Sequence, residues 1–120
     1  NSLRVLVSDK NGRPVPGAQI KVNMTRHAFP FSSALVTSHW SGDSLSPQDT
    51  AQYREKFRLA FNGLVPENDL KWAASIGEWG ENFNLDKTVQ TLRELKQEGY
   101  FVRGHVLVWP GFEHTPNKYK

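Results

Sequence analysis

After residue 28, the hydrophobic pattern of the sequence switches repeatedly between strand-like and helix-like spacing. Short apolar runs typical of strands lie at residues 29–37, 63–65 and 100–109, and helical spacing fills residues 47–61 and 85–98. An order of β-α-β-α-β indicates parallel strands joined by crossover helices. The sequence therefore predicts an α/β fold with about three strands and two helices.

Both predicted helices have recognisable ends. Ser46 is a good N-cap, Pro47 suits the first helical position and Asp49 places a carboxylate in the first turn. Asn84 can cap the second helix, and Gly99 suits the left-handed residue that commonly follows a helix. These signals fix where the two helices are expected to begin and end.

The first 28 residues have a different character. Residues 3–8 and 18–22 are strand-like, and residues 9–17 between them are dense in turn-forming Asn, Gly and Pro. We expect a short β-hairpin or a pair of neighbouring strands here. The predicted organisation is therefore a strand pair over residues 1–28 that leads into a βαβαβ unit over residues 29–120.

Composition excludes several classes of function. The formal net charge is only +3 and the basic residues are scattered, so we expect no nucleic-acid partner. No apolar run approaches the roughly eighteen residues of a membrane span. The chain has no Cys, its four His lack the spacing of a metal site, and no phosphate-binding glycine motif follows the first strand. We therefore expect no metal and no cofactor.

Polar residues follow the predicted strand at residues 63–65, in the stretch PENDLKW (residues 66–72). Glu67, Asn68 and Lys71 together donate and accept several hydrogen bonds, which suits a ligand with many hydroxyls. Loops at the carboxyl ends of parallel strands build binding sites in α/β proteins. A structural interpretation is equally open, because Glu67 and Lys71 are spaced to pair with each other on a helix.

A second polar stretch is RGHVLVWP (residues 103–110). His105 lies within the predicted third strand, where a histidine is more often a core residue than a ligand. Trp109 lies at the carboxyl end of that strand, where an exposed indole can stack against a sugar ring. From these residues alone, a core role and a binding role both stay open.

Together, the two stretches resemble glycoside hydrolase family 10, the endo-β-1,4-xylanases. That family has E-N-x-x-K-W at the end of its second barrel strand and R-G-H-x-L-x-W on its third, which correspond here to residues 67–72 and 103–109. Residues 4–35 are similar to the strand pair that precedes the first barrel strand in many members. Where the family commonly has His after the tryptophan, this chain has Pro110 and Gly111, which indicates a divergent branch.

The resemblance implies the N-terminal part of a (β/α)₈ TIM barrel, a fold of roughly 250 residues. It implies a retaining endo-1,4-β-xylanase that acts on xylan or xylo-oligosaccharides. Glu67, Asn68 and Lys71 would bind the sugar on the non-reducing side of the cleaved bond. His105 and Trp109 would line the subsite where the bond breaks, with Trp72 packed behind them.

The resemblance also implies what this chain lacks. The family's two catalytic glutamates lie beyond the fourth and seventh barrel strands, so we expect no catalytic residue here and no activity of the chain alone. Its partner would be the rest of the barrel, on the same polypeptide or another chain. The polymeric substrate implies a secreted or cell-surface location.

Two alternatives remain. The pattern D-x-x-G-x-P-V-P-G-A-x-I-x-V at residues 9–22 also resembles appended β-sandwich modules, so the chain could be a non-catalytic carbohydrate-binding or adhesion module. The helical patterns at residues 47–61 and 85–98 oppose that alternative, since such modules are nearly all β. The other alternative is a half-barrel that assembles with another chain.

Overall fold

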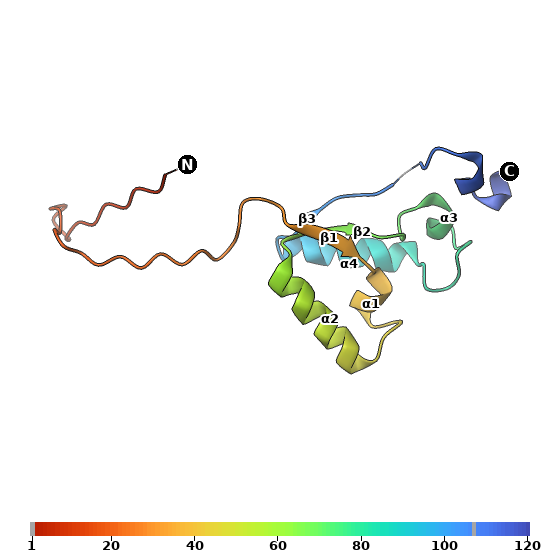
Figure 1. Ribbon diagram of the computed structural model, residues 1–120, viewed down its shortest axis with the longest axis horizontal. Helices are drawn as coiled ribbons and strands as arrows, with labels where there is room; N and C mark the ends of the chain where they lie inside the picture. Colours follow the sequence, from red (N-terminus) through yellow and green to blue (C-terminus); the bar gives the residue numbers. More distant parts are fainter. Residues whose placement is uncertain (1, 107) are drawn as a thin grey trace.

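The computed structural model describes residues 2–106 and 108–120, and its centre is a small parallel sheet. Strands β1 (Ser32–Leu35), β2 (Gly63–Pro66) and β3 (Phe101–Val102) lie in the order β1-β2-β3 (Figure 1). The other elements are α1 (Thr37–Ser41), α2 (Pro47–Ala60), α3 (Trp72–Ser75), α4 (Leu85–Gln97) and the 3₁₀ turns η1 (Phe112–His114) and η2 (Asn117–Tyr119). The predicted parallel α/β arrangement is confirmed for residues 32–102.

The two long helices begin where the sequence predicts. The Ser46 hydroxyl accepts a hydrogen bond from the Asp49 N–H at 3.1 Å, and Pro47 opens α2. The Asn84 side chain accepts from the Lys87 N–H at 3.0 Å and caps α4. Each helix ends one residue before its predicted boundary, and Gly99 takes the expected positive φ of 93°.

One face of the sheet carries the core. Leu35, Leu64 and Leu95 are completely buried and cluster with Trp40 and Phe57, so β1, β2, α1, α2 and α4 meet at one place. The cluster places α2 and α4 on the same side of the sheet. Burial of apolar area of this kind is the main favourable term in folding.

The opposite face of the sheet combines small residues with one large aromatic side chain. Ser32, Gly63 and Phe101 lie side by side in the register of the three strands. A Cβ atom on Gly63 would lie 2.2 Å from the Ser32 hydroxyl and 3.3 Å from Phe101, so a larger residue there would require these neighbours to shift. Phe101 is 55% exposed, which leaves this face largely open among the described residues.

The first predicted strand, over residues 29–37, is too long. Pairing stops at Leu35, because the Val36 N–H donates to the Tyr53 hydroxyl at 3.1 Å instead of to a neighbouring strand. The chain then enters α1, a helix that the hydrophobic pattern did not indicate. α1 brings Trp40 into the core.

The third predicted strand, over residues 100–109, is also wrong in extent. Only Phe101 and Val102 pair with β2, and one further backbone bond joins the Arg103 N–H to the Leu64 carbonyl at 2.9 Å. Among the described residues, no strand pairs with the other edge of β3, so little holds the chain extended beyond it. Leu107, which falls in this prediction, lies outside the described residues.

The expected strand pair before the sheet does not form as a ladder. A turn forms, in which the Asp9 carboxylate accepts from the N–H groups of Asn11 and Arg13 at 2.8 and 2.9 Å, and a single antiparallel bridge joins Ser8 to Pro14. No β-strand longer than this bridge forms within residues 2–28, and this segment extends away from the sheet (Figure 1). The apolar side chains of this segment do not pack against a second layer. Packing of that kind is the main contribution to strand stability, so the predicted strand pair is not stabilised here.

Candidate functional site

The predicted binding residues follow β2 at the edge where the parallel strands end. The Glu67 N–H donates to the Leu35 carbonyl at 2.9 Å, so the last ladder bond lies directly before the polar stretch. Since β1, β2 and β3 are parallel, the segments that follow them leave the sheet at the same edge. This places the two sequence motifs near each other.

Asn68 and Lys71 form a compact hydrogen-bonded unit. The Lys71 N–H donates to the Asn68 carbonyl at 2.9 Å, which closes a tight turn before α3. The Lys71 ammonium donates to Asn68 Oδ1 at 2.6 Å, and both side chains are half-buried. An ammonium has three donors, so Lys71 keeps donors for a ligand.

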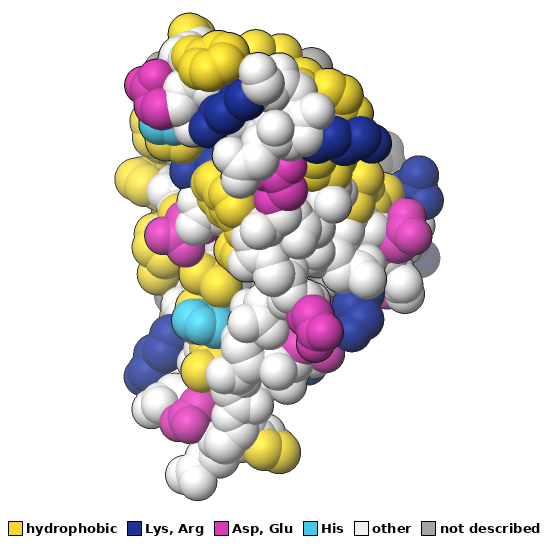
Figure 2. Space-filling view, turned by 90° about the vertical axis from the view of Figure 1, so that its right-hand side faces the viewer, with side chains coloured by type: hydrophobic (Ala, Val, Ile, Leu, Met, Phe, Trp, Pro, Cys, Tyr) yellow, Lys and Arg dark blue, Asp and Glu magenta, His cyan; other side chains and the backbone are white. Residues whose placement is uncertain are grey.

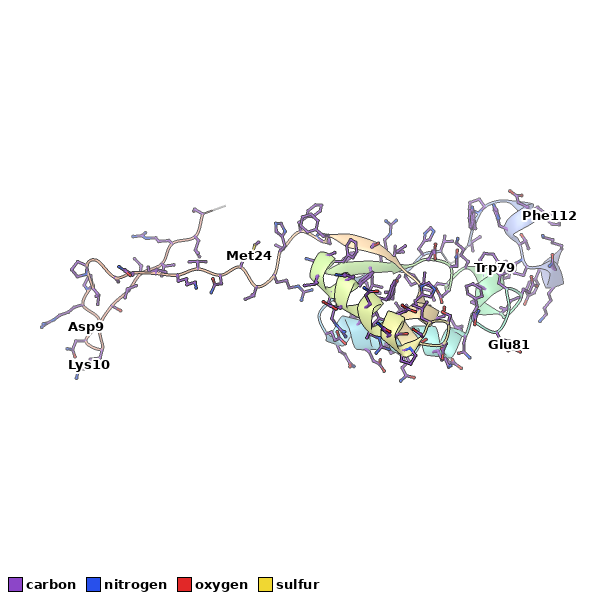
Figure 3. All side chains as sticks on the ribbon, turned by 60° about the horizontal axis from the view of Figure 1, so that its bottom comes forward. Asp9, Lys10, Met24, Trp79, Glu81 and Phe112 are labelled. Carbon is purple, nitrogen blue, oxygen red and sulfur yellow. The ribbon has the colours of Figure 1, made fainter. Side chains whose placement is uncertain are left out.

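The Lys71 ammonium also lies over the face of Trp109. Its Nζ is 4.5 Å from the centroid of that indole and 5.8 Å from that of Trp79, within the range of a cation–π contact. The two indoles are 42% and 44% exposed, so each keeps a free surface. Figure 3 labels Trp79 near the C-terminal end of the chain. Asn68, Lys71 and Trp109 are thus brought together, and their role in binding a substrate stays a prediction.

His114 joins this group without having been predicted to. Its ring stacks on Trp109 with a centroid distance of 4.1 Å and an interplanar angle of 23°. The turn η1 produces this contact, and residues 112–114 carry no periodic pattern that would predict that turn. In Figure 2, hydrophobic side chains gather beside Lys and Arg at this end of the molecule. A cation between exposed aromatic faces suits a ligand with both hydroxyls and apolar ring faces, such as a sugar.

Glu67 and His105 are placed differently. Glu67 is exposed just after β2, and His105 is exposed beyond the end of β3 rather than inside a strand. Among the described residues, neither side chain makes a hydrogen bond, an ion pair or a ring contact. The alternative of a Glu67–Lys71 ion pair is not realised, because the ammonium turns to Asn68. Only three of the five predicted residues therefore lie in contact.

Comparison with protein families shows which family the chain matches. The family model for glycosyl hydrolase family 10 matches residues 23–119, which is most of the chain.

The chain belongs to glycosyl hydrolase family 10.

Three curated proteins are similar to this family 10 chain. Anti-sigma-I factor RsgI6 of Acetivibrio thermocellus is 27% identical over 96% of the chain and 14% of its own length. The bifunctional endo-1,4-beta-xylanase XylA of Ruminococcus flavefaciens is 31% identical over 63% of the chain and 9% of its own length. An endo-1,4-beta-xylanase of Naganishia albida is 32% identical over 49% of the chain and 18% of its own length.

The matches cover less than a fifth of each of these relatives. No solved structure matches the chain. The family membership supports the resemblance inferred from the two motifs, and it disfavours the alternative of a nearly all-β binding module.

Asp69, in the centre of the family 10 motif, is a structural residue that sequence reasoning missed. It is only 5% exposed, and its carboxylate accepts a hydrogen bond from the Thr37 hydroxyl at the start of α1. Burial raises the pKa of Asp69, and hydrogen bonds from backbone N–H groups and from Thr88 lower it again in part. Asp69 thus ties the loop after β2 to α1 and α4, directly beside Asn68.

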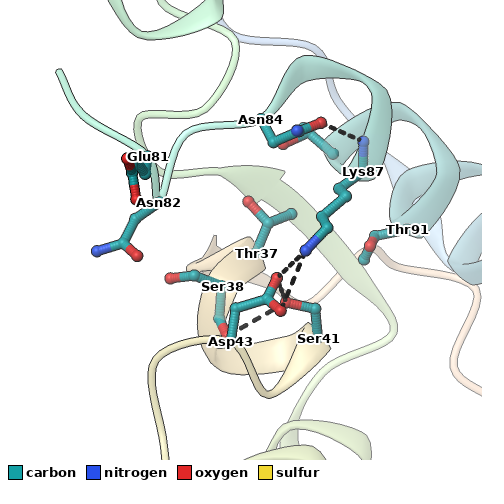
Figure 4. Close-up of a pocket in the computed structure, with 10 residues that line it drawn as sticks. Thr37, Ser38, Ser41, Asp43, Glu81, Asn82, Asn84, Lys87 and Thr91 are labelled. Atoms are coloured by element: carbon teal, nitrogen blue, oxygen red, sulfur yellow. Dashed lines mark hydrogen bonds and ion pairs between the residues drawn. The ribbon is translucent and has the colours of Figure 1, made fainter. Parts of the chain in front are cut away.

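A polar pocket of about 210 Å³ lies between α1 and the start of α4 (Figure 4). It contains none of the five predicted binding residues. Inside it, the Asp43 carboxylate accepts from the Ser41 hydroxyl at 2.8 Å and from the Lys87 ammonium at 3.2 Å. The Ser41 hydrogen bond, followed by that from Lys87, lowers the pKa of Asp43. Asp43 and Lys87 pair with each other between α1 and α4, so we interpret this pocket as a junction between helices.

Other site classes find no support in residues 2–106 and 108–120 of this family 10 chain. No group of three or more His, Cys, Asp or Glu side chains there is arranged to hold a metal ion. In the same residues, none of the helices has both the length and the apolar character needed to cross a membrane.

Proposed function

We propose that this chain is the N-terminal part of a retaining endo-1,4-β-xylanase barrel and supplies part of its sugar-binding wall. The observation that carries the proposal is the contact of Lys71 with Asn68 and Trp109 at the carboxyl end of a parallel sheet. The two xylanases among the relatives support xylan or xylo-oligosaccharide as the substrate. Acting on a polymer, such an enzyme would work outside the cell or at its surface.

Each residue has a distinct task in this proposal. Asn68 orients the Lys71 ammonium, whose remaining N–H groups donate to sugar hydroxyls. Trp109 is 42% exposed, and it offers the part of its indole that Lys71 and His114 leave uncovered to the sugar. Glu67 and His105, both exposed at the same edge, contact the sugar on the non-reducing side and at the cleaved bond respectively.

The acid/base and the nucleophile come from the rest of the barrel, on the same polypeptide or another chain. A retaining glycosidase needs two carboxyl groups about 5–5.5 Å apart on either side of the scissile bond. Glu67 is not given either role, because its motif assigns it to substrate binding. The outer edges of β1 and β3, which pair with no other strand among the described residues, are where the remaining strands would close the barrel.

The first test measures kcat/KM for xylotetraose in the full-length protein, the whole polypeptide that contains this sequence. Lys71→Met keeps the length of the side chain but removes its donors, and Trp109→Ala removes the indole. We expect each to lower kcat/KM about tenfold or more. For Lys71 a hydrogen bond from a charged group contributes ~1.5–3 kcal/mol, and for Trp109 the indole contact with the sugar is lost. Glu55→Gln, on an exposed position of α2, is the matched control and should leave kcat/KM unchanged.

A second measurement addresses the missing glutamates. The 120-residue chain alone should release no reducing sugar from xylan. Hydrolysis by the purified chain would contradict the assignment of both catalytic groups to other parts of the barrel. A full-length protein that does not hydrolyse xylan or xylotetraose would overturn the proposed function as a whole.

A further inference from the structure

The C-terminal segment, residues 109–120, lies against the loop that follows β2 although the two are far apart in sequence. Trp72 stacks on Tyr119 with a centroid distance of 4.9 Å. The Glu78 carboxylate accepts from the N–H groups of Asn117 at 2.9 Å and Lys118 at 3.2 Å. Together with the contact of Lys71 with Trp109, these interactions join the loop to both ends of the C-terminal segment.

Glu78 is well suited to hold this segment. Each of its two carboxylate oxygens accepts one backbone N–H at the start of η2, where the first N–H groups of a helical turn have no partner of their own. Hydrogen bonds to an ionised carboxylate are roughly twice as strong as neutral ones. One side chain therefore fixes two consecutive residues of the segment.

The position of Glu78 is itself fixed by the end of α3. Gly77 has a φ of 84°, and its N–H donates to the Ala74 carbonyl at 3.0 Å. The Glu78 N–H donates to the Ala73 carbonyl at 3.0 Å, which completes a Schellman motif. Ala73 and Ala74 are buried, so the carboxylate of Glu78 is carried by an anchored turn.

The C-terminal segment connects Glu78 to Trp109 through a series of contacts. Between its two 3₁₀ turns, Pro116 is fully buried. The Lys120 ammonium donates to the Glu113 carbonyl at 3.1 Å, which connects η2 back to η1. His114 of η1 stacks on Trp109. A shift of η2 would therefore move the ring that lies on Trp109.

We propose that Glu78 is a positioning residue: by holding the N–H groups of Asn117 and Lys118, it keeps the Trp109 ring, on which His114 stacks, against the Lys71 ammonium. Its consequence for sugar binding rests on the proposed function, whereas its effect on Trp109 does not. Glu78 touches no reacting group in this proposal, and it acts through the C-terminal segment. Loss of its carboxylate releases η2 and lets Trp109 leave the Lys71 ammonium.

The test labels the full-length protein with 5-fluorotryptophan and follows the ¹⁹F resonance of Trp109, which Trp109→Phe identifies. In Glu78→Ala this resonance should move towards the value of a solvent-exposed indole, and hydrogen exchange of residues 112–120 should quicken. Glu78→Gln retains one acceptor oxygen and should give an intermediate shift. Glu81→Ala, which removes an exposed carboxylate of the same loop, should leave the resonance unchanged.

Kinetics on the same variants connect Glu78 to the site. Glu78→Ala should lower kcat/KM for xylotetraose about three- to tenfold, chiefly through a higher KM, and Glu78→Gln should recover part of the loss. A Trp109 resonance that is identical in Glu78→Ala and the wild type would overturn the positioning role. A moved resonance with unchanged kcat/KM in an active enzyme would instead overturn the consequence of this positioning for sugar binding. If the wild type shows no hydrolysis, the proposed function fails, and the ¹⁹F shift still decides whether Glu78 positions Trp109.

Discussion

Residues 3–7 and residues 63–66 are both short apolar segments, but their surroundings in the molecule are opposite. Leu64 lies between two neighbouring strands and beneath the helices, and it is completely buried. Leu6 has a similar side chain and is 78% exposed. Strand propensity therefore does not decide the outcome here, and the presence of a second layer does.

The dimensions of the molecule reflect this contrast. A compact domain of 120 residues has an expected radius of gyration of about 14 Å. The value here is 21.5 Å, with principal extents of 73 × 35 × 20 Å, because residues 2–28 extend away from the sheet (Figure 1). Residues 32–102 hold the buried core, and the N-terminal segment adds length without adding to it.

Leu64→Ala should produce the largest effect, because it attacks the centre of the packed region. Removing the buried side chain loses its transfer free energy and leaves a cavity, at a cost of ~2–5 kcal/mol. Urea unfolding of the full-length protein measures this change. Leu6→Ala is the matched control and should change the free energy of unfolding by less than ~0.5 kcal/mol. Equal losses of unfolding free energy in Leu64→Ala and Leu6→Ala would contradict the contrast between the two regions.

Asp69→Ala should be the next most damaging, since it breaks the polar junction of the packed region. The Thr37 hydroxyl would lose its buried acceptor, and such losses cost ~1–3 kcal/mol. Asp69→Asn keeps an acceptor oxygen and should cost less. Urea unfolding near neutral pH measures both variants, with Glu55→Gln on an exposed position of α2 for comparison.

The pH dependence of the same variants sharpens this prediction. Because the folded-state pKa of Asp69 is raised above its ordinary value of 3.8, the folded state binds more protons just above that pH than the unfolded state does. This contribution to stability is complete below pH 3.8 and disappears as the pH rises through the folded-state pKa. The Asp69→Asn variant should not show this loss of stability with rising pH. If the unfolding free energy depended on pH in the same way in Asp69→Asn and the wild type, burial would not raise the pKa of the Asp69 carboxyl.

The packed region was largely predictable because its signals are local. Ser46 and Asn84 cap helices wherever an apolar face follows, and Leu35, Leu64 and Leu95 bury once those helices pack on the sheet. The short helix α1 was not predictable from periodicity. It depends on the Val36 N–H finding the Tyr53 hydroxyl, a contact between residues distant in sequence.

The candidate site was predictable only in part, for a related reason. The motif identified Asn68, Lys71 and Trp109, which the structure brings together. Trp79 and His114 had no signal of their own, because loops and 3₁₀ turns place them. Asp69 was overlooked because, in the sequence, a buried carboxylate looks the same as an exposed one. The proposed roles of Glu67 and His105 stay predictions, since both side chains are exposed.

Ile20→Ser should have the smallest effect, and it tests the N-terminal side of the contrast. Ile20, Val22 and Met24 alternate with polar residues, as in a strand with one covered face. All three are exposed here, at 49%, 62% and 76%. A side chain that buries no area in the fold contributes little, so the expected change in unfolding free energy is below ~0.5 kcal/mol.

Urea unfolding of the full-length protein measures this change in the Ile20→Ser variant and in a Val22→Ser variant. Both substitutions fall on the same alternating face. A loss above about 1 kcal/mol at both positions would mean that another part of the polypeptide covers this face. Gln19→Ala, on the opposite side of the same segment, is the control and should be neutral. Small changes at all three positions would confirm that strand-like alternation alone, without a second layer, adds no stability to this molecule.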